Sequence, residues 1–273
     1  MKIMAKPDSN RFESDAGRYA AYLETPEGRL RLDLTFANLR EFLRPDKDSL
    51  RALDLGCGTG ATAVRLARSG LQVTLLDSSP AMLDLAQRAA QEAGIAEKIT
   101  VKLGDAARLA DLFPAESFDV ILCHNLLEYV DDPQAVLCGA TRLMRNSSAI
   151  LSVLVRNRAG EVFKAAIQAG DLAQAENNVS AEWVQESLYG GRARLFTPDG
   201  LQAMLKTASL AIAVQRGVRV IADYLPPRIS RDTEYPRILE LERKLGRLPE
   251  FAAVARYTHC LARRSGPLTE SRL

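Results

Sequence analysis

The chain has 273 residues, 47% of them hydrophobic and 26% charged, with 36 lysines and arginines against 34 aspartates and glutamates. This composition excludes a disordered chain and a collagen-like fibre, and a chain of this length can bury a large core without disulfides or metals. No apolar run approaches the roughly 18 residues of a membrane span, and no secretory signal is recognisable, so we expect a soluble, cytoplasmic protein.

The first part of the chain predicts helical structure after a short tail. Apolar residues follow a helical pattern from about residue 12 to residue 43, and Pro26 marks a helix start within it. Pro45 closes this region. We expect these helices to lie outside the main sheet.

Short apolar strands then alternate with helices of about ten residues. The expected strands are residues 51–55, 71–76, 99–103, 118–123, 149–155, 210–220 and 257–262. The expected helices are residues 61–69, 79–93 and 132–144, a helix that starts at Thr197, and residues 235–246. Such alternation is typical of βαβ units and predicts an α/β fold with a mostly parallel sheet. Residues 156–195 lack a regular pattern and are expected to be partly helical.

Glycines and polar residues follow four successive strands where those strands end. They are Gly56, Gly58 and Gly60, then Asp77, then Asp105 and Ala106, and then His124. The glycines leave the backbone bare for a ligand, and the first acid can accept hydrogen bonds from a ribose diol. Because open α/β sheets bind ligands beyond the carboxyl ends of their strands, we expect one site there. A dinucleotide-binding loop and a simple turn are the competing interpretations of the glycines.

These motifs resemble those of the class I S-adenosylmethionine-dependent methyltransferase family. The four motifs are residues 53–60, 75–79, 104–106 and 118–124. The resemblance implies a Rossmann-like fold with a seven-stranded, mostly parallel sheet, helices on both faces, and S-adenosyl-L-methionine as the cofactor. It also implies a tail and helical lid over residues 1–43, and a methyltransferase domain over residues 44–273 with a substrate-side insertion at about 156–196.

Further segments resemble the bacterial methyltransferase family that acts on 5-carboxymethoxyuridine at the tRNA wobble position. They are residues 28–31, 126–130, 217–220, 223–225 and 256–259. This resemblance implies methylation of a carboxylate, with the tRNA anticodon loop as partner. The cofactor contacts that it implies are Arg31, Gly56, Cys57, Gly58, Asp77, Ser78, Asp105, Ala106 and His124, with Arg31 pairing with the carboxylate of the cofactor.

The sequence departs from that family at three places. Residues 145–148 read Arg-Asn-Ser-Ser where the family has Arg-Pro-Gly-Gly, the insertion has no lysine-rich stretch, and Tyr129 replaces a common tryptophan. A small-molecule O- or N-methyltransferase, and a cofactor-binding protein without turnover, are therefore alternatives. Residues 191–273 contain 15 basic and 8 acidic residues, a balance that suits either an anionic partner or an ordinary solvated surface, and the sequence indicates no oligomeric state.

Methyl transfer from a sulfonium is an in-line displacement, so positioning is the main catalytic contribution. A carboxylate acceptor with a pKa of about 4 is ionised at neutral pH and needs no general base. We therefore assign no catalytic acid or base and expect cations and hydroxyls to orient the acceptor. The candidates are Tyr19, Arg156, Arg194, Arg219 and Tyr224.

The cysteines and histidines predict no metal site. Cys57, Cys123, Cys138 and Cys260 are scattered, and the chain has only two histidines. A zinc site needs clustered ligands at set spacings. We expect four reduced thiols.

Overall fold

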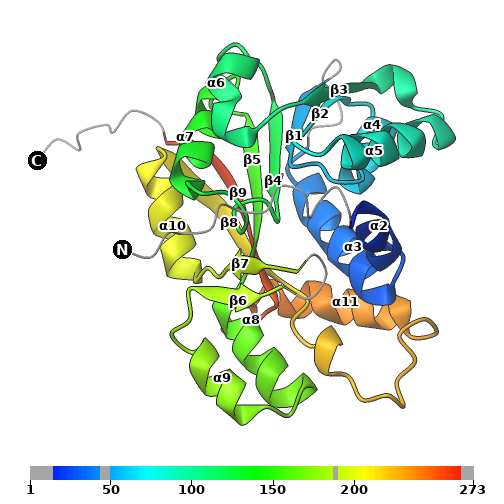
Figure 1. Ribbon diagram of the computed structural model, residues 1–273, viewed down its shortest axis with the longest axis vertical. Coiled ribbons are helices and arrows are strands. Elements are labelled where there is room, and N and C mark those ends of the chain that lie inside the picture. The colour runs from blue at the N-terminus through cyan, green and yellow to red at the C-terminus, as the bar shows by residue number, and fades with distance from the viewer. Residues whose placement is uncertain (1–14, 44–49, 187–189, 266–273) are drawn as a thin grey trace, which may run out of the picture.

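A seven-stranded sheet forms the centre of the computed structural model, which describes residues 15–43, 50–186 and 190–265 (Figure 1). Its order is β3-β2-β1-β4-β5-β9-β8. The strands are β1 (Arg51–Leu55), β2 (Gln72–Asp77), β3 (Ile99–Leu103), β4 (Val120–His124), β5 (Ile150–Arg156), β8 (Leu210–Val218) and β9 (Tyr257–Arg264). Strand β9 runs antiparallel to both of its neighbours, β5 and β8, and the other six strands run in one direction. The mostly parallel seven-stranded sheet is thus confirmed.

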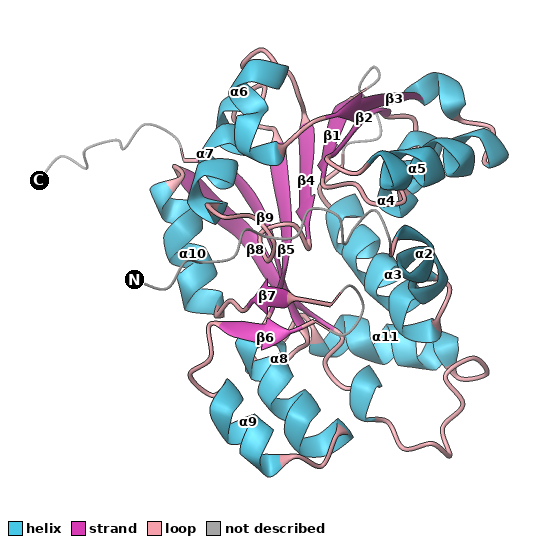
Figure 2. Cartoon of the chain, viewed as in Figure 1, coloured by secondary structure: helices cyan, strands magenta, loops and turns pink. Residues whose placement is uncertain are grey.

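Helices connect the strands and pack on both faces of the sheet (Figure 2). They are α2 (Ala16–Leu23), α3 (Pro26–Arg40), α4 (Ala61–Arg68), α5 (Pro80–Glu92), α6 (Leu109–Leu112), α7 (Pro133–Leu143), α8 (Arg158–Phe163), α9 (Leu172–Asn178), α10 (Pro198–Thr207), α11 (Tyr235–Leu245) and α12 (Pro249–Ala252). Helices α3, α4 and α5 pack against one face, and α6, α7 and α10 against the other. Alternation within β1 serves both cores, since Ala52 points to the first set of helices and Leu53 to the second.

The N-terminal helical region consists of two helices, and the second starts at Pro26 as predicted. Helix α2 ends before Thr25, whose hydroxyl accepts a hydrogen bond from Gly28 N at 3.1 Å and so begins α3. A side chain at Gly28 would place its Cβ 2.1 Å from the Tyr22 carbonyl oxygen, because the helices touch there. This close turn brings the tyrosines of α2 over the end of β1.

The segment between β5 and α10 is more regular than predicted. It contains α8, a π-helical turn η3 (Lys164–Gln168), α9, and a hairpin of β6 (Trp183–Gln185) with β7 (Arg192–Arg194). These elements lie together at the lower end of the molecule in Figure 2. The division into lid, main domain and insertion stays a prediction.

The described residues contain neither a membrane-spanning helix nor a cluster of metal ligands. Between residues 15 and 265, outside the gaps at 44–49 and 187–189, no helix is long and apolar enough to cross a bilayer. The same residues contain no cluster of three metal-ligating side chains. All four cysteines are free thiols.

Candidate functional site

A cavity of about 660 Å³ lies beyond the carboxyl ends of the parallel strands. It adjoins the point between β1 and β4 where the strand order changes direction, the usual ligand position in such sheets. The predicted residues that line it are Tyr19, Arg31, Gly56, Gly58, Asp77, Ser78, Asp105, Ala106, His124, Arg156 and Arg219. The strand-end and helical candidates therefore meet in one place.

The loop after β1 approaches the cavity as bare backbone. Gly56 and Gly58 have φ angles of +62° and +53°, which favour glycine. A Cβ at Gly58 would lie 3.0 Å from Tyr19 Cε1, and one at Gly56 would lie 2.9 Å from Leu126 Cδ1. Larger residues would therefore both strain the turn and close the space.

Asp77 joins the end of β2 to this loop. Its Oδ2 accepts a hydrogen bond from Gly58 N at 2.9 Å, and its Oδ1 accepts one from Ser79 N at 3.0 Å. Asp54 lies buried beneath the loop, and burial together with the charge of Asp77 raises the pKa of Asp54 to about 8. The carboxylate at the cavity is thus the one on Asp77, while Asp54 holds its proton at neutral pH.

Arg31 reaches the cavity from α3 and is held by neutral groups. Its guanidinium donates to Asn125 Oδ1 at 3.0 Å and to the Tyr19 hydroxyl at 2.9 Å. It also lies 5.1 Å from the centre of the Tyr22 ring and 5.8 Å from that of Tyr257. These contacts orient a buried positive charge toward the cavity.

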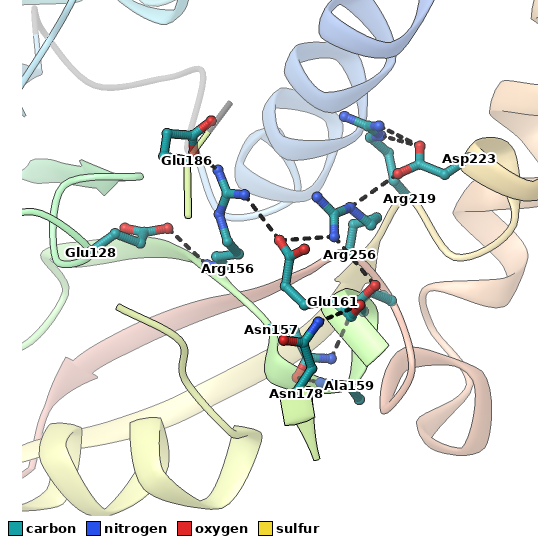
Figure 3. Close-up of polar contacts among 12 residues, drawn as sticks. Glu128, Arg156, Asn157, Ala159, Glu161, Asn178, Glu186, Arg219, Asp223 and Arg256 are labelled. Carbon is teal, nitrogen blue, oxygen red and sulfur yellow. Dashed lines mark hydrogen bonds and ion pairs between the residues drawn. The ribbon is translucent and has the colours of Figure 1, made fainter. Parts of the chain in front are cut away.

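Six buried or largely buried charged residues form an ion cluster at the ends of β5, β8 and β9 (Figure 3). The cluster consists of Arg156, Arg219, Arg256, Glu161, Glu186 and Asp223. Glu161 lies 2.9 Å from Arg156 and 3.0 Å from Arg256. Asp223 lies 3.0 Å from Arg256 Nε and also pairs with Arg219, and Glu186 pairs with Arg156. Each guanidinium is therefore held in a defined place.

The backbone after β8 positions two members of the ion cluster. Arg219 has a φ of +62°, a conformation that costs energy for a non-glycine residue. The buried Glu242 carboxylate on α11 accepts hydrogen bonds from the N–H groups of Val220 and Ala222, at 2.6 and 2.7 Å. This anchor fixes the turn that places Arg219 and Asp223 on the cavity side.

Tyr257 lies among the arginines of the site. Burial raises the pKa of its phenol, but four surrounding positive charges outweigh burial and lower that pKa to about 8. They belong to Arg31, Arg219, Arg156 and Arg256. A fraction of this phenol is therefore ionised at slightly alkaline pH.

A chain of hydrogen bonds runs from α3 to the cavity through buried side chains. Asn38 Nδ2 donates to His259 Nδ1 at 3.2 Å, so His259 Nε2 carries the proton and donates to Ser152 Oγ at 2.8 Å. Ser152 in turn donates to His124 Nε2 at 2.8 Å. Both imidazoles are neutral, because burial lowers the pKa of each, to about 3 for His259. The chain fixes the orientation of His124 at the cavity wall.

We expect His259 to make the fold sensitive to acid. Burial, with a smaller contribution from Arg216, holds the pKa of folded His259 at about 3, against about 6.5 in an unfolded chain. Between these values the unfolded state binds a proton that the folded state excludes, so stability falls as pH falls. From pH 6.5 to pH 5 the wild type should lose about 1.6 kcal/mol more than His259→Gln.

Urea unfolding of both proteins at the two pH values measures this difference. Other titrating groups, including Asp54, are common to both proteins and largely cancel. Equal losses in the two proteins would show that His259 does not titrate in this window on unfolding.

The chain is similar in sequence to known methyltransferases. A family profile described as "Methyltransferase domain" matches residues 53–152. The tRNA 5-carboxymethoxyuridine methyltransferase of Escherichia coli strain K12 is 30% identical over 247 residues, which cover 88% of this chain and 90% of that protein. The chain belongs to the class I S-adenosylmethionine-dependent methyltransferase family. The predicted family, enzyme class and cofactor are thereby confirmed.

Other relatives of this methyltransferase act on different substrates. The ubiquinone biosynthesis O-methyltransferase of Paracidovorax citrulli is 33% identical over 171 residues, or 62% of this chain and 66% of that protein. A solved methyltransferase from Thermotoga maritima shares the fold with a TM-score of 0.60 at 16% identity, over 94% of this chain and 99% of its own. The 1,6-didemethyltoxoflavin-N1-methyltransferase of Burkholderia thailandensis, with S-adenosylhomocysteine bound, has a TM-score of 0.56 at 17% identity, over 97% and 93%.

The cavity of the methyltransferase has the features that S-adenosylmethionine requires. The bare glycine loop admits close approach, and a Cβ at either lining glycine would occupy part of that space. Asp77 presents an acceptor at the end of β2, and Asp105 follows β3, with one oxygen engaged by Ala107 N at 2.8 Å. These residues fit a nucleoside with a ribose diol and an adenine ring.

Three predicted site residues are not among those that line the cavity. Cys57 faces the core beside α4, and burial raises the pKa of its thiol. The Arg194 guanidinium lies 4.4 Å from the Trp183 ring on the β6–β7 hairpin, and the Tyr224 hydroxyl donates to the Gly160 carbonyl at 3.3 Å. The structure thus directs Arg194 and Tyr224 to local partners rather than to the cavity.

Several residues that line the site were not among those assigned to it from the sequence. They are Tyr22, Asn125, Glu161, Lys164, Glu186, Asp223, Arg256 and Tyr257. Arg256 and Tyr257 stand at the start of β9, not at its end. Because β9 is antiparallel, its first residues meet the carboxyl ends of the parallel strands. A prediction that the last strand is antiparallel would have placed Arg256 and Tyr257 at the site.

Proposed function

We propose that this methyltransferase methylates the carboxylate of 5-carboxymethoxyuridine in the anticodon loop of tRNA. The single observation that carries the proposal is the set of guanidiniums and phenols in the same cavity as the glycine loop. Arg156, Arg219 and Arg256 come from the β5, β9 and β8 half of the sheet, whereas the nucleoside-binding features come from β1 to β4. A cofactor and an acceptor therefore have separate, adjoining walls.

On the cofactor wall, which lies at the ends of β1 to β4, we assign the cofactor contacts that the sequence motifs predict. Asp77 accepts from the ribose hydroxyls, Asp105 and Ala106 meet the adenine, and Arg31 pairs with the carboxylate of the cofactor. The Gly56 and Gly58 backbone, Ser78 and His124 complete this wall. When bound, S-adenosylmethionine supplies an electrophilic methyl group on a positively charged sulfur.

On the acceptor wall, which is the part of the cavity formed around the ion cluster, the protein orients an acceptor that is already ionised. No proton has to be removed from a carboxylate at neutral pH, so the residues only position one oxygen and exclude water. Guanidiniums suit this role because their planar donors match the two oxygens of a carboxylate. Arg156 and Arg219, with the hydroxyls of Tyr19 and Tyr257, are the orienting groups in this proposal.

Two further observations support RNA as the partner. The similarity to the E. coli tRNA enzyme covers 88% of the chain, whereas that to the P. citrulli ubiquinone-pathway enzyme covers 62%. The β6–β7 hairpin also carries Trp183 on one strand and Arg192 and Arg194 on the other, with guanidiniums 5.0 and 4.4 Å from the centre of the tryptophan ring. Aromatic and arginine planes of this kind stack on unpaired bases.

The test is methyl transfer to tRNA from cells that lack this gene. We expect labelled methyl to enter that tRNA and nuclease digestion to release a methyl ester of 5-carboxymethoxyuridine, identified by mass. Tyr257→Phe should still bind cofactor. Transfer to a phenolic small molecule, with none to tRNA, would instead support the O-methyltransferase alternative.

A further inference from the structure

The formal charges of the ion cluster cancel. Its three arginines are matched by Glu161, Glu186 and Asp223, each within ion-pair distance of a guanidinium. A fourth acid, Glu128, accepts a hydrogen bond from Arg156 N at 2.8 Å on the other side of that residue. The cluster is therefore a rigid set of donors, but it offers an anionic acceptor no net positive charge.

Lys164 brings a positive charge to the same cavity. It is half-buried, lines the cavity, and begins the π-helical turn η3, whose last residue, Gln168, lines the cavity too. Among residues 15–43, 50–186 and 190–265, no carboxylate forms an ion pair with its amine. The charge of this lysine is thus available to a ligand, unlike those of the three paired arginines.

Lys164 lies on the ion-cluster side of the cavity. Burial raises the pKa of Glu161, but Arg256, Arg156 and Lys164 together lower it below its usual value, so the lysine charge acts at that carboxylate. The preceding residue, Phe163, has its ring 6.5 Å from that of Tyr224, next to Asp223. Helix α8 thus carries Glu161 into the ion cluster and continues directly into the turn that carries Lys164.

A π-helical turn begins at Lys164, directly after α8. Ala169 N bonds to the Lys164 carbonyl at 3.1 Å, five residues apart, which widens the helix by one residue. Such turns redirect the side chains around them and are frequent at functional sites. Here the turn begins with Lys164 and ends with Gln168, and both residues line the cavity.

We propose that Lys164 is an acceptor-binding residue that selects acceptors carrying a carboxylate. This inference rests on the proposed function, which it deepens by assigning the charge that recognises the acceptor. An amine that no carboxylate pairs with, in a partly dehydrated cavity, attracts an anion more strongly than it would in water. The neutral ion cluster then orients the carboxylate that the lysine has attracted.

The same charge distinguishes substrate from product. Transfer forms a bond between a carboxylate oxygen and the methyl carbon, the sulfur–methyl bond breaks, and its electron pair stays on sulfur. The acceptor changes from an anion to a neutral ester. Lys164 therefore favours the acid over the ester, which promotes release of methylated tRNA.

The experiment compares wild type with Lys164→Met, Lys164→Arg and the control Lys206→Met, an exposed lysine on α10. With tRNA that carries 5-carboxymethoxyuridine, Lys164→Met should lower kcat/KM about tenfold, which corresponds to about 1.4 kcal/mol. Most of this change should be in KM. Lys164→Arg should restore most of this loss, and Lys206→Met should match wild type. Cofactor affinity should be unchanged in all variants, which a folding defect would not allow.

A binding measurement tests charge selection directly. Proteins saturated with S-adenosylhomocysteine are titrated with tRNA bearing the acid and with tRNA bearing its methyl ester. Wild type should prefer the acid severalfold, and Lys164→Met should show no preference. If Lys164→Met methylates tRNA with unchanged KM and retains the preference, the inference is overturned while the proposed function stands.

A small probe separates failure of the inference from failure of the proposed function. Phenoxyacetate carries the aryloxyacetate group without RNA. If wild type does not methylate tRNA, the proposed function fails, and binding of phenoxyacetate by wild type but not by Lys164→Met would still support the lysine assignment. Absence of both tRNA methylation and phenoxyacetate binding overturns both.

Discussion

Replacement of Asp223 by asparagine is expected to lower the free energy of unfolding by about 3–5 kcal/mol, the range for breaking a buried ion pair. The carboxylate lies between Arg219 and Arg256 and is almost inaccessible to water. Asparagine keeps the size of the side chain but removes its charge. Two buried guanidiniums then lose a counter-charge that water cannot replace.

Asp232→Asn is the matched control for this prediction. Asp232 pairs with Arg29 at 2.9 Å, but its side chain is 77% exposed. Exposed pairs of this kind contribute about 0–1 kcal/mol, so the control should unfold close to wild type. Urea unfolding at neutral pH measures both variants, and similar losses would mean that water reaches the ion cluster.

Asp77→Ala is expected to weaken S-adenosylmethionine binding at least tenfold, or about 1.4 kcal/mol. The substitution removes the proposed acceptor for the ribose hydroxyls. It also removes the hydrogen bond from Gly58 N that holds the glycine loop against the end of β2, and the bond from Ser79 N within the turn after β2. Both losses act on the same ligand, so the effect on affinity should exceed that of a lost surface contact.

Titration calorimetry with S-adenosylmethionine measures this affinity. Asp84→Ala is the control, since Asp84 is an exposed acid on the following helix, α5. It should bind the cofactor as wild type does. An Asp77→Ala protein that folds normally and retains full affinity would refute the ribose role.

The activity at alkaline pH is expected to depend on Tyr257, which lies among the arginines of the site. Positive charges lower the pKa of Tyr257 to about 8, so mild alkali places a negative charge beside the arginines. A phenolate there competes with an anionic acceptor for those guanidiniums. Tyr257→Phe lacks the phenol hydroxyl. Comparing its activity at alkaline pH with that of wild type therefore isolates the effect of the phenolate.

The residues proposed to bind the cofactor could be named from sequence because each lies in a local motif. A strand, the loop that follows it and the first residue of the next helix are contiguous in the chain, so Gly56, Gly58 and Asp77 identify themselves by position. Parallel strands then bring these loops to one edge of the sheet without further information. The same logic located Arg156, at the end of β5.

The arrangement of the ion cluster was determined by the tertiary structure. Its acids come from α8, from the residue after β6 and from the turn after β8, and an antiparallel β9 brings Arg256 to meet them. No spacing in the sequence records which arginine such distant acids neutralise. Sequence alone therefore determined that the glycine loop and Asp77 lie at one edge of the sheet, where a nucleoside site is predicted. The fold decided which arginines are paired with acids, because ion pairing depends on distances that only packing sets.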